Sequence, residues 1–488
     1  MRTVKKIILI YPNADLLDVF ITHAPLSLIY ASVELIKNGF EVEIIDLRLH
    51  VNHWRSVLRK IINDEVFVAG ISVMSDNSTK HAAEIGKFIK SINKNIIIVW
   101  GGSYATFYPR LILKNDWRCD YVISGPGAKC FFELVDLIKK DEEPNKVKGI
   151  SYLKNRELIR LAPEDKIFET YKFKELPYHL IKNYSFYGQL DQNKLIFSLY
   201  SSFGCPYQCT FCSVPAESAN ILGNKWQPLP EKNVVDHIEY LVKNYHANYI
   251  YFIDNDSFVD LKHVDSILDE IKNRHLKLKL GFRGARISEI KKMSDEFLYK
   301  LADSGTDILH IGAESGSARM LELMHKDCTP EDIIECNQKL SRYPKITAAY
   351  NFLLLIPTET IEDLKQTRNL ILRLVKDNPR CIIFAPNKYR PIPGTKLYKL
   401  AQENPPPTAR IIRYFNMLFI VSYFIDDKIL KTTQGKTLLY KLLRLICAFY
   451  KPIAKLRIKY EFDQFLIEYP LFNLSSKLIC IFNLRKNT

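Results

Sequence analysis

The chain has 488 residues, of which 47% are hydrophobic and 25% charged, and its formal net charge is +15 at pH 7. This composition is typical of a globular protein and excludes a wholly disordered chain. The length exceeds what one hydrophobic core usually serves, so two or three domains are expected. Because no stretch of about 18 uncharged apolar residues occurs, no transmembrane helix is predicted.

The amino-terminal segment MRTVKKIILIYPNADLLD predicts a first β-strand rather than a secretory signal. Asn13 and Asp15 end its apolar run after about six residues, which is too short for the apolar core of a signal peptide. The ten cysteines of the chain show no disulfide framework. Both observations favour a protein of the reducing cytosol, so a cytoplasmic location is expected.

Residues 1–140 alternate strand-like and helix-like patterns. The predicted strands are short runs rich in Val and Ile, namely KKIILIYP, FEVEIIDL, VFVAGISV, NIIIVWGG and CDYVISGPG. Strands that are apolar throughout are typical of a parallel sheet covered by helices on both faces. We therefore predict a doubly wound α/β domain over residues 1–140, with its ligand site beyond the carboxyl ends of the strands.

Loops at that edge of the predicted sheet supply the candidate ligand contacts of this domain. Glycine in such a loop permits close approach of the backbone to a ligand, although it is equally typical of an ordinary turn. The candidate residues are Gly101, Gly102, Tyr104, Gly125 and Gly127.

Residues 141–194 are less regular, and a linker with small elements is predicted there. Strand and helix then alternate about six times over residues 195–400, which predicts a partial six-stranded β/α barrel with its chemistry at the carboxyl ends of the strands. The predicted strands are Leu195–Tyr200, Tyr249–Asp254, Lys277–Arg283, Asp307–Gly312, Thr347–Leu355 and Cys381–Pro386.

Three cysteines lie close together just after the first of these strands. Cys205, Cys209 and Cys212 have the spacing C-x3-C-x2-C. A disulfide would leave one thiol over, and a structural zinc site needs a fourth ligand, which no nearby His supplies. Iron–sulfur clusters accept closely spaced thiolates, and a four-iron cluster held by three of them leaves one iron open. A molecule with an amine and a carboxylate could chelate that open iron.

The cysteine segment resembles the signature of the radical S-adenosylmethionine (SAM) superfamily, in which an aromatic residue, here Phe211, precedes the last cysteine. Four later segments are similar to motifs of the cobalamin-associated branch of that superfamily: FIDNDSFVD, HIGAESGSARMLELMHK, NFLLLIPTETIEDL and PIPGTKLY. The amino-terminal domain resembles the cobalamin-binding domain of the same branch, most closely in WGGSYATFYP and DYVISGPG. The resemblance covers about residues 5 to 400.

The resemblance implies a [4Fe-4S] cluster held by the three cysteines, with SAM on the open iron. Reductive cleavage of SAM would give a 5′-deoxyadenosyl radical, with an electron from a reductant such as flavodoxin or ferredoxin. The alternative for each acidic strand-end residue below is a turn or capping role. The residues implied to contact SAM are Phe211 beside the adenine, Asn255 and Asp256 at the amine or ribose, Glu314 and Ser315 beside the cofactor, and Arg286 at the carboxylate.

The cobalamin-binding motif departs from the pattern of that branch. The sequence D-x-H-x-x-G, whose His ligates cobalt, is absent, and His50 and His53 lie elsewhere and are expected to face solvent. Tyr104 stands where the branch often has His, and Ala128 where it often has Glu. Two interpretations stay open: a domain that binds cobalamin without the His, and a relic that no longer binds it.

Residues 401–488 are predicted as a basic, aromatic-rich helical region. They carry 14 Lys and Arg against 6 Asp and Glu. Basic amphipathic helices of this kind can lie at a membrane interface, which would favour a lipid or other hydrophobic substrate. The alternative is a helical cap packed on the open barrel, and the two interpretations are compatible.

The leading hypothesis is a cobalamin-dependent radical SAM enzyme that transfers a methyl group to an unactivated carbon of a small molecule. The alternatives are radical rearrangement or oxidative cyclisation without methyl transfer, and a radical SAM enzyme without cobalamin. Methylthiolation is disfavoured because only Cys119 and Cys130 precede the cysteine motif, too few for a second cluster. A nucleic-acid partner is not favoured, because the basic charge comes with no RNA-binding signature.

Overall fold

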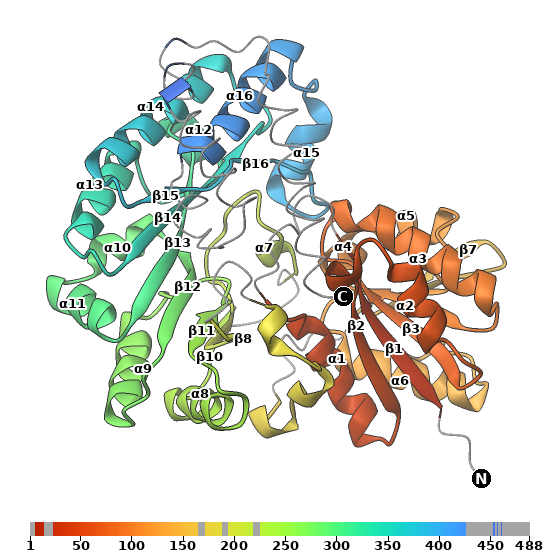
Figure 1. Ribbon diagram of the computed structural model, residues 1–488. Helices are drawn as coiled ribbons and strands as arrows, with labels where there is room; N and C mark the ends of the chain where they lie inside the picture. Colours follow the sequence, from red (N-terminus) through yellow and green to blue (C-terminus); the bar gives the residue numbers. More distant parts are fainter. Residues whose placement is uncertain are drawn as a thin grey trace. The chain divides into compact units, whose positions relative to one another are not determined.

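A computed structural model of the chain describes residues 5–13, 23–163, 171–187, 194–217 and 225–425, together with residues 452, 453, 456 and 460. The chain divides into two compact units near residue 190. Each unit is built on one seven-stranded sheet (Figure 1).

The first unit has a sheet with the strand order β2-β1-β3-β4-β5-β6-β7. The strands from β2 to β5 are parallel to one another, and β6 and β7 continue the sheet antiparallel. The strands are β1 (Lys6–Tyr11), β2 (Glu41–Asp46), β3 (Val66–Ser72), β4 (Ile97–Gly101), β5 (Tyr121–Ile123), β6 (Ile150–Lys154) and β7 (Glu157–Arg160). The helices are α1 (Leu26–Lys37), α2 (Trp54–Ile61), α3 (Thr79–Ile92), α4 (Ser103–Phe107), α5 (Pro109–Lys114) and α6 (Ala128–Lys140), with short 3-10 turns at Leu47–His50, Asp76–Ser78, Phe173–Glu175, Tyr178–Leu180 and Tyr184–Phe186.

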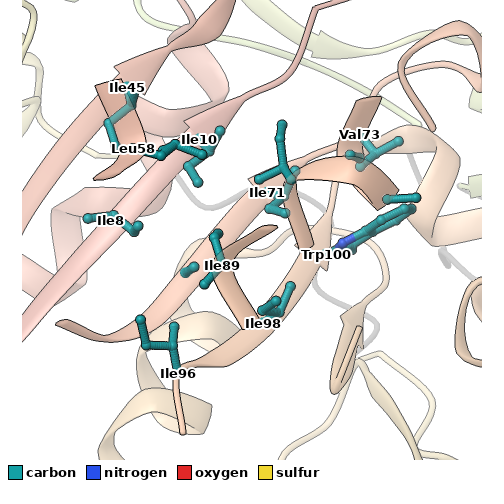
Figure 2. Close-up of a cluster of buried hydrophobic side chains, with 14 of the residues drawn as sticks. Ile8, Ile10, Ile45, Leu58, Ile71, Val73, Ile89, Ile96, Ile98 and Trp100 are labelled. Atoms are coloured by element: carbon teal, nitrogen blue, oxygen red, sulfur yellow. The ribbon is translucent and has the colours of Figure 1, made fainter. Parts of the chain in front are cut away.

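Alternate residues of β1 serve the two faces of this sheet. Ile8 and Ile10 belong to a core shared with α2, α3 and α5 (Figure 2). Ile7 and Leu9 belong to a second core, shared with α1 and α6. Burial on both faces explains why the strands read as continuous apolar runs, and it confirms the predicted doubly wound domain. The β6–β7 hairpin lies within residues 141–194, so part of the predicted linker extends the sheet.

The second unit has six parallel strands in the order β15-β14-β13-β12-β11-β8, and β16 pairs with β14 as a seventh. All six strands predicted from the sequence are present. The strands are β8 (Ile196–Leu199), β11 (Tyr249–Phe252), β12 (Lys279–Ala285), β13 (Thr306–Glu314), β14 (Thr347–Leu354), β15 (Ile382–Ile383) and β16 (Asn387–Lys388), and a separate ribbon pairs β9 (Ser202–Gly204) with β10 (Trp226–Pro228). The helices are α7 (Ser213–Glu217), α8 (Glu231–Tyr245), α9 (Leu261–Asn273), α10 (Ile287–Lys292), α11 (Asp295–Asp303), α12 (Ala318–Leu323), α13 (Pro330–Ser341), α14 (Ile361–Asp377), α15 (Lys396–Glu403) and α16 (Ala409–Ile425).

Strand β13 shows how this second sheet is buried. Leu309, Ile311 and Ala313 are fully buried, whereas the alternating residues between them are only partly buried. One of these alternating residues, His310, lies between the rings of Tyr251 and Phe384, at centroid distances of 5.5 and 5.1 Å. The less buried face of the sheet is therefore lined partly by aromatic side chains. This arrangement fits the predicted partial β/α barrel, and the predicted fold class is confirmed.

The last described helix, α16, packs against α14 and β15. Met417 and Leu418 at its middle are buried, as expected of a helical cap. The predicted helical character of the carboxyl-terminal region is confirmed for α15 and α16, whereas most of the basic segment from residue 426 onward lies outside the described residues. Among the helices that are described, none has the length and apolarity required to cross a membrane.

Candidate functional site

The three motif cysteines lie on one loop at the carboxyl end of β8. Cys205 follows β9 directly, and its backbone N–H donates to the carbonyl of Lys225, 3.0 Å away, next to β10. The N–H of Cys212 donates to the carbonyl of Cys209 at 3.2 Å, which closes the loop between them. All three thiols are free and only partly buried. The loop therefore carries three free cysteines at the edge where a β/α barrel carries its chemistry.

Asp254, just past β11, holds the start of this loop. Its carboxylate is fully buried. It accepts hydrogen bonds from the N–H of Ser201 (2.8 Å), the hydroxyl of Ser201 (2.5 Å) and the N–H of Ser202 (3.1 Å). His263 reaches the carbonyl of Ser201 from α9 at 3.3 Å. The chain before Cys205 is thus fixed to the neighbouring strand by a buried polar cluster.

Thr210 anchors the middle of the loop. Its buried hydroxyl donates to the carbonyl of Leu323 at 2.8 Å, and its N–H donates to the carbonyl of Met324 at 3.2 Å. Its own carbonyl accepts from the N–H of Leu397 in α15 at 3.0 Å. The segment between Cys209 and Cys212 is therefore tied to the end of α12 and the start of α15.

Arg286 lies against the second cysteine. Its Nη1 is 3.1 Å from the Sγ of Cys209, and its Nη2 is 3.2 Å from a carboxylate oxygen of Asp327. Its guanidinium carbon lies 3.8 Å from the centroid of the Tyr207 ring. The sequence predicts Arg286 at the SAM carboxylate, whereas in the structure its side chain is already engaged by the cysteine loop.

Asp256 and Glu289 form a buried carboxyl pair beneath Arg286. Both are almost completely buried. Burial raises the pKa of Asp256 well above its usual range, and the neighbouring Glu289, hydrogen-bonded to it, raises the pKa further. Both effects favour the protonated form of Asp256. The Asp256 side chain thus belongs to the supporting layer of the site, and its predicted contact with SAM stays a prediction.

Glu314 and Lys326 form a second buried pair. Glu314 ends β13 in the left-handed backbone region, at φ 62°. Its Oε1 lies 3.3 Å from the Nζ of Lys326. Burial lowers the pKa of Lys326, but the charges of Glu314, Cys209 and Cys328 together leave the pKa above its ordinary value. The pair stands at the same edge of the sheet.

Three other residues predicted to contact SAM differ in the solvent exposure of their side chains. The Ser315 side chain is fully buried, with its hydroxyl 3.2 Å from that of Thr367 and accepting from the N–H of Ser317. Asn255 is exposed, and Phe211 is partly buried. Ser315 is therefore used internally, through its hydroxyl and through its N–H, which donates to the carbonyl of Ala313 at 2.8 Å, whereas the side chain of Asn255 is exposed and that of Phe211 partly so.

The turn after β14 carries unusual backbone geometry. Leu355 and Thr358 adopt φ values of 61° and 69°, in the left-handed region that favours glycine. Glu359, which lies just before α14, is buried and accepts a hydrogen bond from the N–H of Leu355 at 2.5 Å. Burial raises the pKa of Glu359 to about 8. Strained backbone and a perturbed carboxyl group at one strand end are typical of functional edges.

The three-thiol loop fits an iron–sulfur cluster by its donor set. Burial raises the pKa of Cys205 to about 12 and that of Cys212 to about 11, so these side chains are neutral thiols until a metal displaces their protons. Three sulfurs on one anchored loop match the ligands that such clusters use.

In the first unit, the predicted cobalamin contacts lie in the loops after β4 and β5. Gly102 has φ +99°, and a Cβ there would lie 2.7 Å from the carbonyl oxygen of Val73, so only glycine fits. A Cβ on Gly101 would meet nothing within 4 Å. Tyr104, half-buried, stacks on Tyr108 at a centroid distance of 4.6 Å.

The loop after β5 is similarly open toward solvent. The N–H of Gly125, which has φ +78°, donates to the hydroxyl of Thr106 at 3.0 Å, and Gly127 precedes α6. The hydroxyl of Ser124 is buried and has no hydrogen-bond partner among the described residues. An open glycine edge beside an unpaired buried hydroxyl fits the approach of a polar ligand such as cobalamin.

Comparison with protein families agrees with this geometry. A model of the radical SAM superfamily matches residues 199–371, and a model of the B12 binding domain matches residues 17–135. The chain therefore contains a region that matches the radical SAM superfamily, preceded by a region that matches the B12 binding domain. The sequence resemblance to this family is thereby confirmed.

Similar proteins align with most of the chain. The uncharacterized methyltransferase PH0819 of Pyrococcus horikoshii is 26% identical over 410 residues, which is 83% of this chain and 84% of that protein. The anaerobic magnesium-protoporphyrin IX monomethyl ester cyclase of Rubrivivax gelatinosus is 26% identical over 64% of this chain and 54% of its own length. Among solved structures, the radical SAM methyltransferase TsrM of Kitasatospora setae aligns with a TM-score of 0.63 at 19% identity, over 82% of this chain and 75% of TsrM.

Sequence reasoning missed the residues that hold the site together. Asp254, Thr210, Glu289 and Ser124 were not singled out. Asp254 had a signal, since it directly follows a buried strand that leads to the cysteine edge. Thr210 and Glu289 had none, because their partners are carbonyls and side chains distant in sequence.

Proposed function

We propose that this protein is a cobalamin-dependent radical SAM enzyme that modifies an unactivated carbon of a small molecule, most commonly by methyl transfer. The observation that carries this proposal is the anchored loop with three free cysteines at the carboxyl edge of the second sheet. The B12-binding domain that precedes it supports the second cofactor.

Cys205, Cys209 and Cys212 would hold the [4Fe-4S] cluster. When bound, the cluster and SAM supply a 5′-deoxyadenosyl radical, and cobalamin supplies a carrier for the methyl group. The chain itself binds, orients and excludes water. Phe211 would flank the adenine and Asn255 would meet the polar part of SAM, since both side chains are accessible.

The other residues predicted to contact SAM or cobalamin have different roles in this proposal. Glu314 would face SAM together with its partner Lys326. Ser315 would shape the edge beside SAM from within, because its hydroxyl and its N–H are both used internally. Asp256 would support the edge from below. Cobalamin would lie along the glycine loops after β4 and β5, with the unpaired hydroxyl of Ser124 as an additional donor or acceptor.

Cyclisation without methyl transfer is the second candidate. It is favoured by the similarity to the cyclase of Rubrivivax gelatinosus, of which the chain spans about half. Methyl transfer is favoured by the similarity to PH0819, named a methyltransferase, which extends over most of both chains. The cysteine site is compatible with both, because the radical step is common to them.

The test begins with anaerobic purification after iron–sulfur reconstitution and cobalamin supply. We expect about four irons per chain, a corrinoid absorption spectrum and reductant-dependent formation of 5′-deoxyadenosine from SAM. Protein without iron would overturn the radical SAM proposal. An enzyme that binds iron but no corrinoid would show that the first domain is a relic.

A labelling experiment then separates the two reactions. Cells with and without the gene are grown on methionine whose methyl group carries deuterium, and their metabolites are compared by mass spectrometry. A product that depends on the gene and carries the intact deuterated methyl group indicates methyl transfer. A product that depends on the gene but lacks the label indicates cyclisation or rearrangement.

Membrane contact through the basic region after residue 400 is a further part of the proposal, with a hydrophobic substrate as its consequence. Each basic residue near an anionic bilayer contributes about 1 kcal/mol, within a Debye length. Co-sedimentation with anionic and neutral vesicles, for the full chain and for one ending after residue 400, tests it. Equal recovery of both proteins in the supernatant would leave α16 and the following segment as packing elements.

A further inference from the structure

The side chain of Arg286 is buried against the sulfur of a cluster ligand. We propose that Arg286 donates a hydrogen bond to the Cys209 thiolate and thereby raises the reduction potential of the cluster. This inference rests on the proposed function, since it requires the cluster. It assigns Arg286 to the iron–sulfur cluster rather than to the SAM carboxylate.

Three contacts hold the guanidinium in place. Its Nη1 is 3.1 Å from the Sγ of Cys209, its Nη2 is 3.2 Å from Asp327, and its plane covers the Tyr207 ring at 3.8 Å. Only 7% of Arg286 is exposed. A planar guanidinium can donate in two directions while stacking on an aromatic ring, and a lysine ammonium cannot reproduce this combination.

Neighbouring residues restrain this arrangement further. The Tyr207 hydroxyl donates to Glu289 at 2.6 Å, which fixes the ring under the guanidinium. Glu289 also accepts from the N–H of Arg286 at 3.3 Å, at the start of α10. Gly284 allows the end of β12 to approach the residues after β11 closely, because any side chain there would clash: its Cβ would lie 2.6 Å from the carbonyl oxygen of Asn255. Reaching a distant carboxylate would require Arg286 to leave all its partners at once.

The direction of the expected change in the cluster's midpoint potential follows from the positive charge of Arg286. One electron from a flavodoxin or ferredoxin reduces the cluster and makes it more negative, and no proton is required for the balance. Hydrogen bonds to cluster sulfurs and nearby positive charge stabilise the reduced form more than the oxidised form. Arg286 supplies both and stays charged at any working pH. The midpoint potential of the wild-type cluster should therefore be higher than that of a variant without this arginine.

Arg283, in β12 three residues before Arg286, provides a matched control. It is exposed, and within the described part of the chain its guanidinium makes no hydrogen bond or ion pair. Arg283→Gln removes one positive charge from the edge of the sheet without removing a contact to a thiol. Comparing it with Arg286→Gln separates a direct hydrogen bond from the general effect of net charge.

The experiment is a redox titration of the reconstituted full chain, monitored by electron paramagnetic resonance of the reduced cluster. For Arg286→Gln we expect at least a tenfold lower ratio of reduced to oxidised cluster at a fixed potential, which is a midpoint about 59 mV more negative for one electron. Iron content should match that of the wild type. Arg286→Lys should shift the midpoint in the same direction by less, and Arg283→Gln should leave it near the wild-type value.

Several results would overturn the inference. An unchanged midpoint in Arg286→Gln would do so, as would an equal shift in Arg283→Gln. If Arg286→Gln holds no iron, electron–nuclear double resonance on the reduced wild type, labelled with 15N-arginine, decides instead. A 15N coupling supports the hydrogen bond, and its absence overturns it. A wild type without any cluster would overturn the proposed function and this inference together, whereas a loaded cluster with no shift overturns only the inference.

Discussion

Asp254 links the second sheet to the cysteine loop, and its replacement tests whether this anchor is needed for the site. Asp254→Ala removes the acceptor of two buried backbone N–H groups, those of Ser201 and Ser202. An unsatisfied buried donor costs about 1–3 kcal/mol, so the variant should lose about 2–6 kcal/mol of unfolding free energy. Asp254→Asn keeps an oxygen for both groups, and the Ser201 hydroxyl can rotate to accept from the new amide.

The pH dependence separates the carboxylate from its amide counterpart. Burial raises the pKa of Asp254 to about 6, from an ordinary value of 3.8. The folded state therefore binds this proton more tightly than the unfolded state. Its contribution to stability is fully present below pH 4 and is lost as the pH rises through 6, by about 3 kcal/mol in total. Asp254→Asn does not titrate, so its stability relative to the wild type should increase between pH 4 and 6 and then level off.

The assay must report on the second unit alone, because the chain has two units that can unfold separately. Trp226 is the one tryptophan of four that lies beyond residue 190. Fluorine NMR of protein labelled with 5-fluorotryptophan, followed through urea unfolding at several pH values, therefore isolates the stability of this unit. Iron content after reconstitution is measured in parallel. Asp254→Ala with wild-type stability and full iron would refute the reasoning, and so would an Asp254→Asn difference that does not change with pH.

Three further predictions concern the cluster, the glycine loop and the strained turn. Cys209→Ala should abolish iron binding and SAM cleavage, while Cys381→Ala should keep both; 5′-deoxyadenosine from the former under strong reductant would contradict the cluster assignment. Gly101→Trp should block corrinoid uptake and spare iron, since its Cβ has open space around it; corrinoid absorbance equal to wild type would place the ligand elsewhere. Thr358→Gly should stabilise the second unit by about 1 kcal/mol, because the exposed Thr358 is β-branched and has φ 69°. Leu355→Gly should instead destabilise it by about 2 kcal/mol, because a buried side chain is lost. Urea unfolding that shows a change of the same sign for both variants would contradict this account.

The parallel strands were predictable because each is a short apolar run between turn residues, and burial on both faces demands this pattern. The hairpin of β6 and β7 was not predictable from the sequence. Its strands have exposed or half-buried positions at an edge of the sheet, and Gly149, Asn155 and Arg156 around it adopt positive φ. Edge strands need few apolar residues, so the sequence there looks like a linker.

The cysteine loop was predictable from its spacing, but the contacts of its neighbours were not. Arg286 illustrates the reason. Its position just after β12 places it at the correct edge, but so long a side chain can reach several different partners from there. Which of them it meets depends on Tyr207 and Asp327, and neither is near Arg286 in sequence.

The same argument applies to the acidic residues after β11. The sequence F-I-D-N-D places three polar residues beyond one buried strand, and any of them could face a ligand. The structure separates them by their hydrogen bonds: Asp254 accepts from Ser201 and Ser202, Asp256 is hydrogen-bonded to Glu289, and Asn255 is left exposed between them. A buried carboxyl group needs internal partners, so the two acids serve the scaffold and the neutral amide faces solvent. Of the three, Asn255 is therefore the one whose replacement should weaken SAM binding without loosening the cysteine loop.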